Sequence, residues 1–204
     1  MAVIVWAAAV AAAVALSNAV ASSVHTSTSA GASGTAGASF DASAVTATDS
    51  DSLFRTANLT KVLAIARSHL GAGAHVEEVV IYPGYLDTSA VRPGGVLEVY
   101  LNAVGAYEPT STPANPGDTA LLPLARVKAD APAAIAQRIA TDAHVPESQL
   151  RYMIAELDPV SHRFHWLVYT TPGSSVEYFE LAGPTAPLYE LRANSSTGLQ
   201  RVRG

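Results

Sequence analysis

The feature that most constrains the fold is the order of hydrophobic periodicities along residues 53–193, which run helix, strands, helix, strands. Leu59, Val62 and Leu63 begin a helical spacing that continues to a glycine stop, so one amphipathic helix is predicted here. Three stretches of strand character follow, separated by Pro-Gly and Pro-Gly-Gly turn signals: 76–82, 85–91 and 96–104. This part of the chain is typical of a helix followed by an antiparallel meander.

The same order begins again after a loop rich in proline and polar residues at 108–119. Residues 120–127 are a short strand candidate, and Asp130 with Pro132 has the pattern of a helix start. Four more strand candidates follow, each bounded by a turn signal: 150–157, 162–170, 176–181 and 188–192. We therefore predict an α+β fold, an antiparallel sheet with helices on one face, made of two helix-plus-meander units at 53–107 and 120–193.

This element order resembles the tandem helix-plus-antiparallel-sheet modules of extracytoplasmic proteins, such as PepSY-type domains and the bacterial β-lactamase inhibitory proteins. The resemblance covers residues 53–193 and concerns the order of elements, without a diagnostic motif. It implies an extracytoplasmic α+β domain and assigns a role to no single residue.

The N-terminal segment, residues 1–21, has the character of an export signal. Residues 2–16 are an unbroken apolar run, and Ala19 and Ala21 supply the small residues of a cleavage site. Extended to Ala21, the run approaches the roughly 20 residues that span a bilayer, so a retained membrane anchor is the alternative. The Ser, Thr, Ala and Gly tract at 22–52 predicts a flexible linker, and 194–204 a tail. We expect the protein to be secreted or extracytoplasmic, either free or anchored by its N-terminus.

Composition argues against several classes of function. The chain has no cysteine, which excludes disulfides, thiolate zinc sites and cysteine nucleophiles. Its formal net charge of -5 leaves no broad basic surface, so no nucleic-acid partner is expected. No glycine-rich phosphate loop or serine elbow is recognisable, and the sequence therefore predicts no cofactor and no catalytic residue.

Histidine and acidic residues give weak signals. His162 and His165 are three apart in a strand candidate and should point to opposite faces, so no metal site is expected. The same alternation predicts that Trp166 is buried, with Arg163 and His165 on the other face. The scattered acidic residues are explained by solvated strand faces, although two of them could form an acid/base pair. They are Glu77, Glu78, Asp87, Glu98, Glu156, Glu177 and Glu180.

The eight tyrosines are the most suggestive feature, because most of them fall in strand candidates. On an uncovered sheet face they would form a rigid amphipathic surface for a protein, peptide or glycan of the envelope. The alternative is that tyrosine is simply a good strand residue. The candidate surface consists of Tyr82, Tyr85, Tyr100, Tyr107, Tyr169 and Tyr178. The expected function is a non-catalytic extracytoplasmic interaction or sensory module; the alternatives are a cofactor-free hydrolase using a carboxylate pair and a structural subunit of an envelope assembly.

Overall fold

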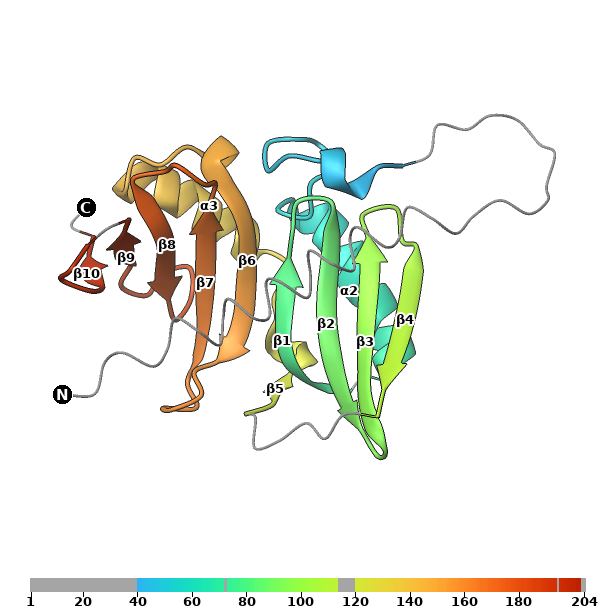
Figure 1. The fold of residues 1–204 in the computed structure, drawn as a ribbon. Coiled ribbons are helices and arrows are strands. Elements are labelled where there is room, and N and C mark those ends of the chain that lie inside the picture. Colours follow the sequence, from blue (N-terminus) through green and yellow to red (C-terminus); the bar gives the residue numbers. More distant parts are fainter. Residues whose placement is uncertain (1–39, 72, 114–119, 194, 203–204) are drawn as a thin grey trace. The chain divides into compact units, whose positions relative to one another are not determined.

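The structure is a computed structural model that describes residues 40–71, 73–113, 120–193 and 195–202 (Figure 1). Within these residues the chain forms a ten-stranded antiparallel sheet with two α-helices, which confirms the predicted α+β class. The expected export segment and residues 22–39 of the expected linker lie outside the described residues.

The two α-helices lie on the same face of the sheet (Figure 1). They are α2, Thr56–Leu70, and α3, Ala131–Asp142. Helix α2 ends at Gly71, whose φ of 93° is in the left-handed region that favours glycine, and its N–H donates to the Arg67 carbonyl. Helix α3 begins with Pro132 in its first turn, as expected, but the Asp130 side chain makes no capping hydrogen bond.

The first four strands form an antiparallel meander whose hairpins pair in sequence order. They are β1 (His75–Ile81), β2 (Tyr85–Arg92), β3 (Gly95–Asn102) and β4 (Tyr107–Thr112). Strand β4 includes the start of the segment expected to be a loop. Residues 108–112 can extend the sheet here because an edge strand tolerates Pro109, which cannot donate a ladder hydrogen bond.

The second set of strands is also antiparallel, and it adds to the other side of β1. Its members are β5 (Leu122–Pro123), β6 (Leu150–Leu157), β7 (Phe164–Thr170), β8 (Val176–Leu181), β9 (Tyr189–Arg192) and β10 (Gln200–Arg201). The sheet order is β10-β9-β8-β7-β6-β1-β2-β3-β4, with β5 paired to β1. Strands β1 and β6 therefore form a seam, in which Glu78 is opposite Glu156 and Ile81 is opposite Met153.

The hydrophobic core lies between the sheet and the helices. Trp166 is 1% exposed and belongs to this core, as strand alternation predicts, while its neighbour His165 is on the opposite face and pairs with two glutamates. Phe179 and Met153 are fully buried on the same side as Trp166. His162 lies in the turn before β7 with a φ of 54°, so the strand begins later than the sequence suggests.

The folded part includes residues that the sequence analysis assigned to the linker and the tail. Ala47 and Ser52 are buried, and the Ser52 hydroxyl accepts from the Phe54 N–H at 3.1 Å. Residues 42–44 form a 3-10 turn whose first carbonyl lies against Gly84. At the other end, Val202 donates its N–H to the Leu188 carbonyl at 2.9 Å. Small polar residues can pack in this way because contact with a preformed sheet offsets their low apolar content.

Candidate interaction surface

Six tyrosines form a continuous ladder of ring contacts across the sheet, on the face opposite the two helices. Successive rings have centroid separations of 4.9, 4.3, 5.1, 4.7 and 5.4 Å. The members, in order, are Tyr100, Tyr85, Tyr82, Tyr152, Tyr169 and Tyr178. We call this side of the sheet the tyrosine face. The ladder arises because strands β3, β2, β6, β7 and β8 each contribute one ring, and Tyr82 follows β1 directly.

The ring planes of the ladder are stacked or tilted against each other. The interplanar angle is 15° for Tyr82 and Tyr85 and 17° for Tyr152 and Tyr169, and the other pairs are tilted by 30° to 36°. Offset aromatic pairs of this kind are favourable beyond their buried area. Tyr82 and Tyr152 are buried, so the accessible ring edges and hydroxyl groups are those of the four partly exposed tyrosines, Tyr85, Tyr100, Tyr169 and Tyr178.

Burial is the first cause that raises the pKa of the ladder tyrosines. It raises the pKa of Tyr100 to about 12, with the nearby carboxylates of Glu108 and Asp87 adding to the effect. The pKa values of Tyr85, Tyr152, Tyr169 and Tyr178 are also raised, chiefly by burial. These five hydroxyls therefore stay protonated at neutral pH and can donate as well as accept hydrogen bonds.

The structure brings together five of the six tyrosines in the candidate surface. Tyr107 is on the helix side, because its strand register places it opposite Leu101, whose side chain is in the core. Its ring stacks on His69 of α2 at 3.8 Å. Tyr152, which the sequence reasoning left out, fills the gap between Tyr82 and Tyr169. Its inclusion depends on the β1 and β6 pairing, for which the sequence carries no local signal.

A row of aliphatic side chains lies beside the tyrosine ladder. Val80, Ile154 and Leu167 are aligned by strand register across β1, β6 and β7. They are 8%, 5% and 8% exposed, respectively. Because strand side chains alternate, these three share a face with the tyrosines that lie two positions away along the same strands. The tyrosine face therefore has an apolar middle.

Acidic side chains form the next row. Glu78 on β1 lies opposite Glu156 on β6, while Asp87 on β2 is opposite Val80 and so continues the aliphatic row. Burial, followed by repulsion from Glu156, Asp87 and Glu77, raises the pKa of Glu78 to about 7. Burial, followed by the Glu98 carboxylate, raises the pKa of Asp87 to about 6. Burial and crowding of like charges disfavour ionisation, so Glu78 and Asp87 hold part of their protons at mildly acidic pH.

His165 links three strands within the acidic row. Its Nε2 lies 2.9 Å from Glu156 Oε1, and its Nδ1 lies 3.2 Å from Glu180 Oε1. Burial alone would lower its pKa, but the two carboxylates outweigh burial and raise the pKa to about 9. An imidazolium that donates from both nitrogens therefore holds β6, β7 and β8 together at neutral pH. The described residues contain no group of three or more metal-binding side chains close enough to share an ion.

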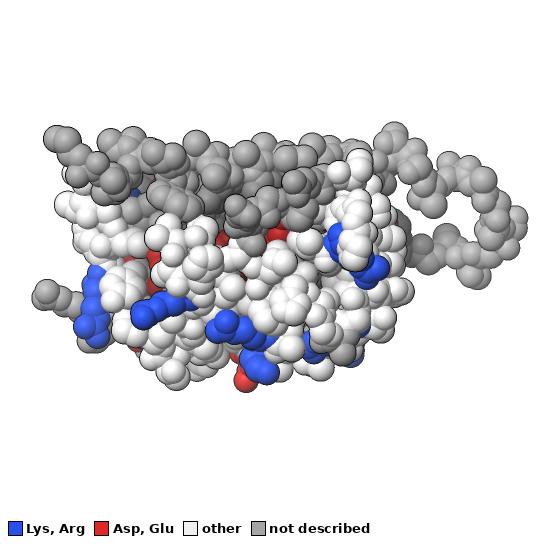
Figure 2. Space-filling model, turned by 90° about the horizontal axis from the view of Figure 1, so that it is seen from below, with Lys and Arg blue, Asp and Glu red and all other residues white. Residues whose placement is uncertain are grey.

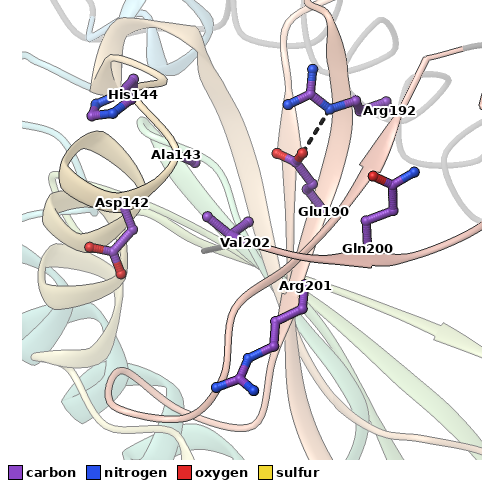
Figure 3. A pocket seen from close by; sticks show the side chains of 8 residues that line it. All are labelled: Asp142, Ala143, His144, Glu190, Arg192, Gln200, Arg201 and Val202. Carbon is purple, nitrogen blue, oxygen red and sulfur yellow. Dashed lines mark hydrogen bonds and ion pairs between the residues drawn. The ribbon is translucent and has the colours of Figure 1, made fainter. Parts of the chain in front are cut away.

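Two hollows lie away from the Glu78 and Glu156 pair. The larger, of about 1070 Å³, opens between the end of α3 and strands β9 and β10 (Figure 3). Within it Arg192 Nε donates to Glu190 Oε1 at 2.7 Å, so these two charges compensate each other. The smaller, of about 270 Å³, borders His165 and Glu180. The carboxylate pair opposite each other in the seam lines neither hollow.

Comparisons with protein-family models, with curated proteins and with solved structures found no match to this chain. In the part of the chain that the structure describes, no helix has the length and apolar content needed to cross a membrane. The tyrosine face is thus interpreted from its own geometry.

Proposed function

We propose that the protein is a non-catalytic extracytoplasmic interaction module of the bacterial envelope, and that it binds a partner through the tyrosine face. The observation that carries this proposal is the six-membered tyrosine ladder, which crosses six adjacent strands beside an aliphatic row. Tyrosine is enriched at protein interfaces because a rigid ring gives contact area at low entropic cost while its hydroxyl directs hydrogen bonds.

The ladder geometry favours a polypeptide partner over a glycan. A sugar ring binds best on the open face of an aromatic ring, whereas the ladder rings cover one another's faces. Ring edges, hydroxyls and a neighbouring aliphatic row suit backbone amides and apolar side chains. The extracytoplasmic location and a secreted or membrane-anchored state are supported by the apolar run at residues 2–16 and the small residues that follow it.

We also propose that the body is a tandem of two helix-plus-meander units, as the resemblance to PepSY-type domains and β-lactamase inhibitory proteins implies. What supports it is that α2 precedes the meander β1–β4 and α3 precedes β6–β9, and that the first long strand of each meander pairs with the other. A structural subunit of an envelope assembly would use the same surface, with a permanent partner instead of a transient one.

Site-specific photocrosslinking tests the proposed function. A benzophenone amino acid replaces Tyr178 on the tyrosine face or, as the control, the exposed Lys61 on helix α2. The full chain is expressed in the producing cell, irradiated, and its crosslinked products are identified by mass spectrometry. We expect one envelope protein to be crosslinked from position 178 and not from position 61. Crosslinks from position 61 alone would contradict the proposal.

A second candidate function, a cofactor-free hydrolase, is favoured by one specific observation. Glu78 and Glu156 are opposite each other on neighbouring strands, and the raised pKa of Glu78 would let it donate a proton near neutral pH, with the Glu156 carboxyl beside it. Assaying chromogenic glycosides and esters between pH 5 and 7 tests it. Activity that disappears in Glu78→Gln would favour this reading over binding.

A further inference from the structure

Carboxylates are concentrated on the tyrosine face of the sheet. The tyrosine face holds a band of carboxylates from β3 to β8, comprising Glu98, Asp87, Glu78, Glu156 and Glu180. Among the described residues, the cation that forms ion pairs with this band is His165, which lies 2.9 Å from Glu156 and 3.2 Å from Glu180. The band is therefore acidic in sum.

Several arginines are engaged on the helix side. Arg67 donates to the Val127 carbonyl and Arg92 to the His69 carbonyl, both at 3.1 Å. Arg138 of α3 pairs with Asp142 at 3.1 Å. Figure 2, viewed from below the sheet of Figure 1, shows Lys and Arg dominating the charged surface, with acidic side chains visible only in small areas.

The band extends across the sheet over two neighbouring rows, because Glu78 is opposite Glu156 whereas Asp87 and Glu180 are in register with the aliphatic row. Strands β3 to β8 are six neighbours in the sheet, and five spacings of about 4.8 Å give a length of roughly 24 Å. The described residues hold no group of three or more ligands that could share one metal ion. Separate carboxylates spread over this length are complementary to several cations carried on one polypeptide chain. About seven residues of an extended chain would cover the length.

We infer that the partner presents a basic, extended polypeptide segment, whose Lys or Arg side chains meet the carboxylate band while its apolar side chains lie on the partly exposed ladder tyrosines, Tyr85, Tyr100, Tyr169 and Tyr178. This inference rests on the proposed function and names the chemistry of its partner. Long cationic side chains can make two kinds of contact with this surface. Their alkyl stems pack on aromatic edges, and their charged ends reach the acidic row. The carboxylates that repel one another in the free protein gain counter-ions in the complex.

The test measures binding of labelled octapeptides to the full chain by fluorescence anisotropy. The probes are Lys-Val repeated four times, Glu-Val repeated four times and Ser-Val repeated four times, all carrying the same dye. The double variant Glu78→Gln with Glu98→Gln removes two carboxyl groups of the band, neither of which forms an ion pair with another described residue. Asp130→Asn, at an exposed residue preceding α3, is the control that removes an acidic charge elsewhere.

We expect the Lys-Val peptide to bind and the other two to bind at least tenfold more weakly. The double variant should weaken Lys-Val binding about three- to tenfold, and a rise in salt from 20 to 300 mM should weaken it further. Asp130→Asn should bind as the unmodified protein does. Thermal midpoints establish that both variants are folded, which is expected because removing like charges relieves repulsion in the band.

Equal binding of the Glu-Val peptide, or unchanged Lys-Val binding in the double variant, would overturn the inference. So would loss of Lys-Val binding on addition of 1 mM Ca²⁺, since the band would then be a divalent-cation site. If a partner is crosslinked from position 178 but no basic peptide binds, the proposed function stands and only the partner chemistry is wrong. If position 178 captures no partner and no probe binds, both fail.

Discussion

Replacing Glu78 by glutamine should stabilise the protein, and only at neutral and alkaline pH. In the folded state burial and the carboxylates of Glu156, Asp87 and Glu77 raise the pKa of Glu78 from about 4.5 to about 7. A group whose folded pKa is raised contributes stability fully below its unfolded pKa and loses that contribution as the pH rises through the folded pKa. Above pH 7 the ionised Glu78 therefore lowers the free energy of unfolding.

The magnitude follows from the displacement of the pKa. A change from 4.5 to 7 corresponds to about 3 kcal/mol between the two protonation states, which the partial exposure of the side chain reduces to about 1 to 3 kcal/mol. Glutamine keeps the shape of the protonated acid and cannot ionise. We expect the free energy of unfolding of Glu78→Gln to exceed that of the unmodified protein by this amount at pH 8.5, and by nearly nothing at pH 4.

Urea denaturation at the two pH values measures the effect, and a thermal midpoint should rise by about 2 to 4 °C per kcal/mol in a chain of this size. Glu108→Gln on the exposed edge strand β4 is the control and should change stability little at either pH. Equal stabilisation at pH 4 and pH 8.5 would refute the reasoning, since the effect would not then come from ionisation. Destabilisation at pH 8.5 would refute it more directly.

Three further predictions concern single side chains. Trp166→Ala should cost about 3 to 5 kcal/mol in urea denaturation because the ring is buried in the core, whereas Leu199→Ala, at a residue 42% exposed, should cost under about 1 kcal/mol. His165→Gln should cost about 1 to 3 kcal/mol at pH 6 and progressively less as the pH rises through about 9, where the imidazolium loses its proton; a constant cost would argue against ion pairing. Gly84→Ala should cost about 1 to 3 kcal/mol, because a Cβ there would clash with the Ala42 carbonyl oxygen, and Gly183→Ala, with open space around it, is the matched control for thermal midpoints.

The elements that could be predicted from sequence are those with a local signal. The buried apolar face of α2 follows from a period of 3.6 residues, and the burial of Trp166 follows from a period of 2 residues. Both periods can be read from the spacing of apolar residues in the sequence. The distribution of tyrosines over successive strands was readable for the same reason. That distribution favoured a common surface without fixing which rings share a face.

The parts that sequence could not provide depend on long-range pairing. Whether Tyr152 joins the ladder and Tyr107 leaves it is decided by strand register, which a one-residue shift would reverse. The approach of Glu78 to Glu156 likewise exists only once β1 pairs with β6. The folded course of residues 40–52 was missed because its residues are small and polar, and their contacts are made with a hairpin that follows in the chain.

The β1 and β6 seam has a consequence for the speed of folding. Each meander is assembled from hairpins between neighbouring strands, and isolated hairpins close in about 1 to 10 μs. The seam joins residues more than 70 positions apart, Ile81 with Met153 and Glu78 with Glu156. Closing this long loop costs conformational entropy before the contacts of the seam can stabilise it. If the seam is formed in the transition state, substitutions that weaken it should lower the folding rate constant measured in a chevron plot. Equally destabilising substitutions in the outer hairpins should instead raise the unfolding rate constant.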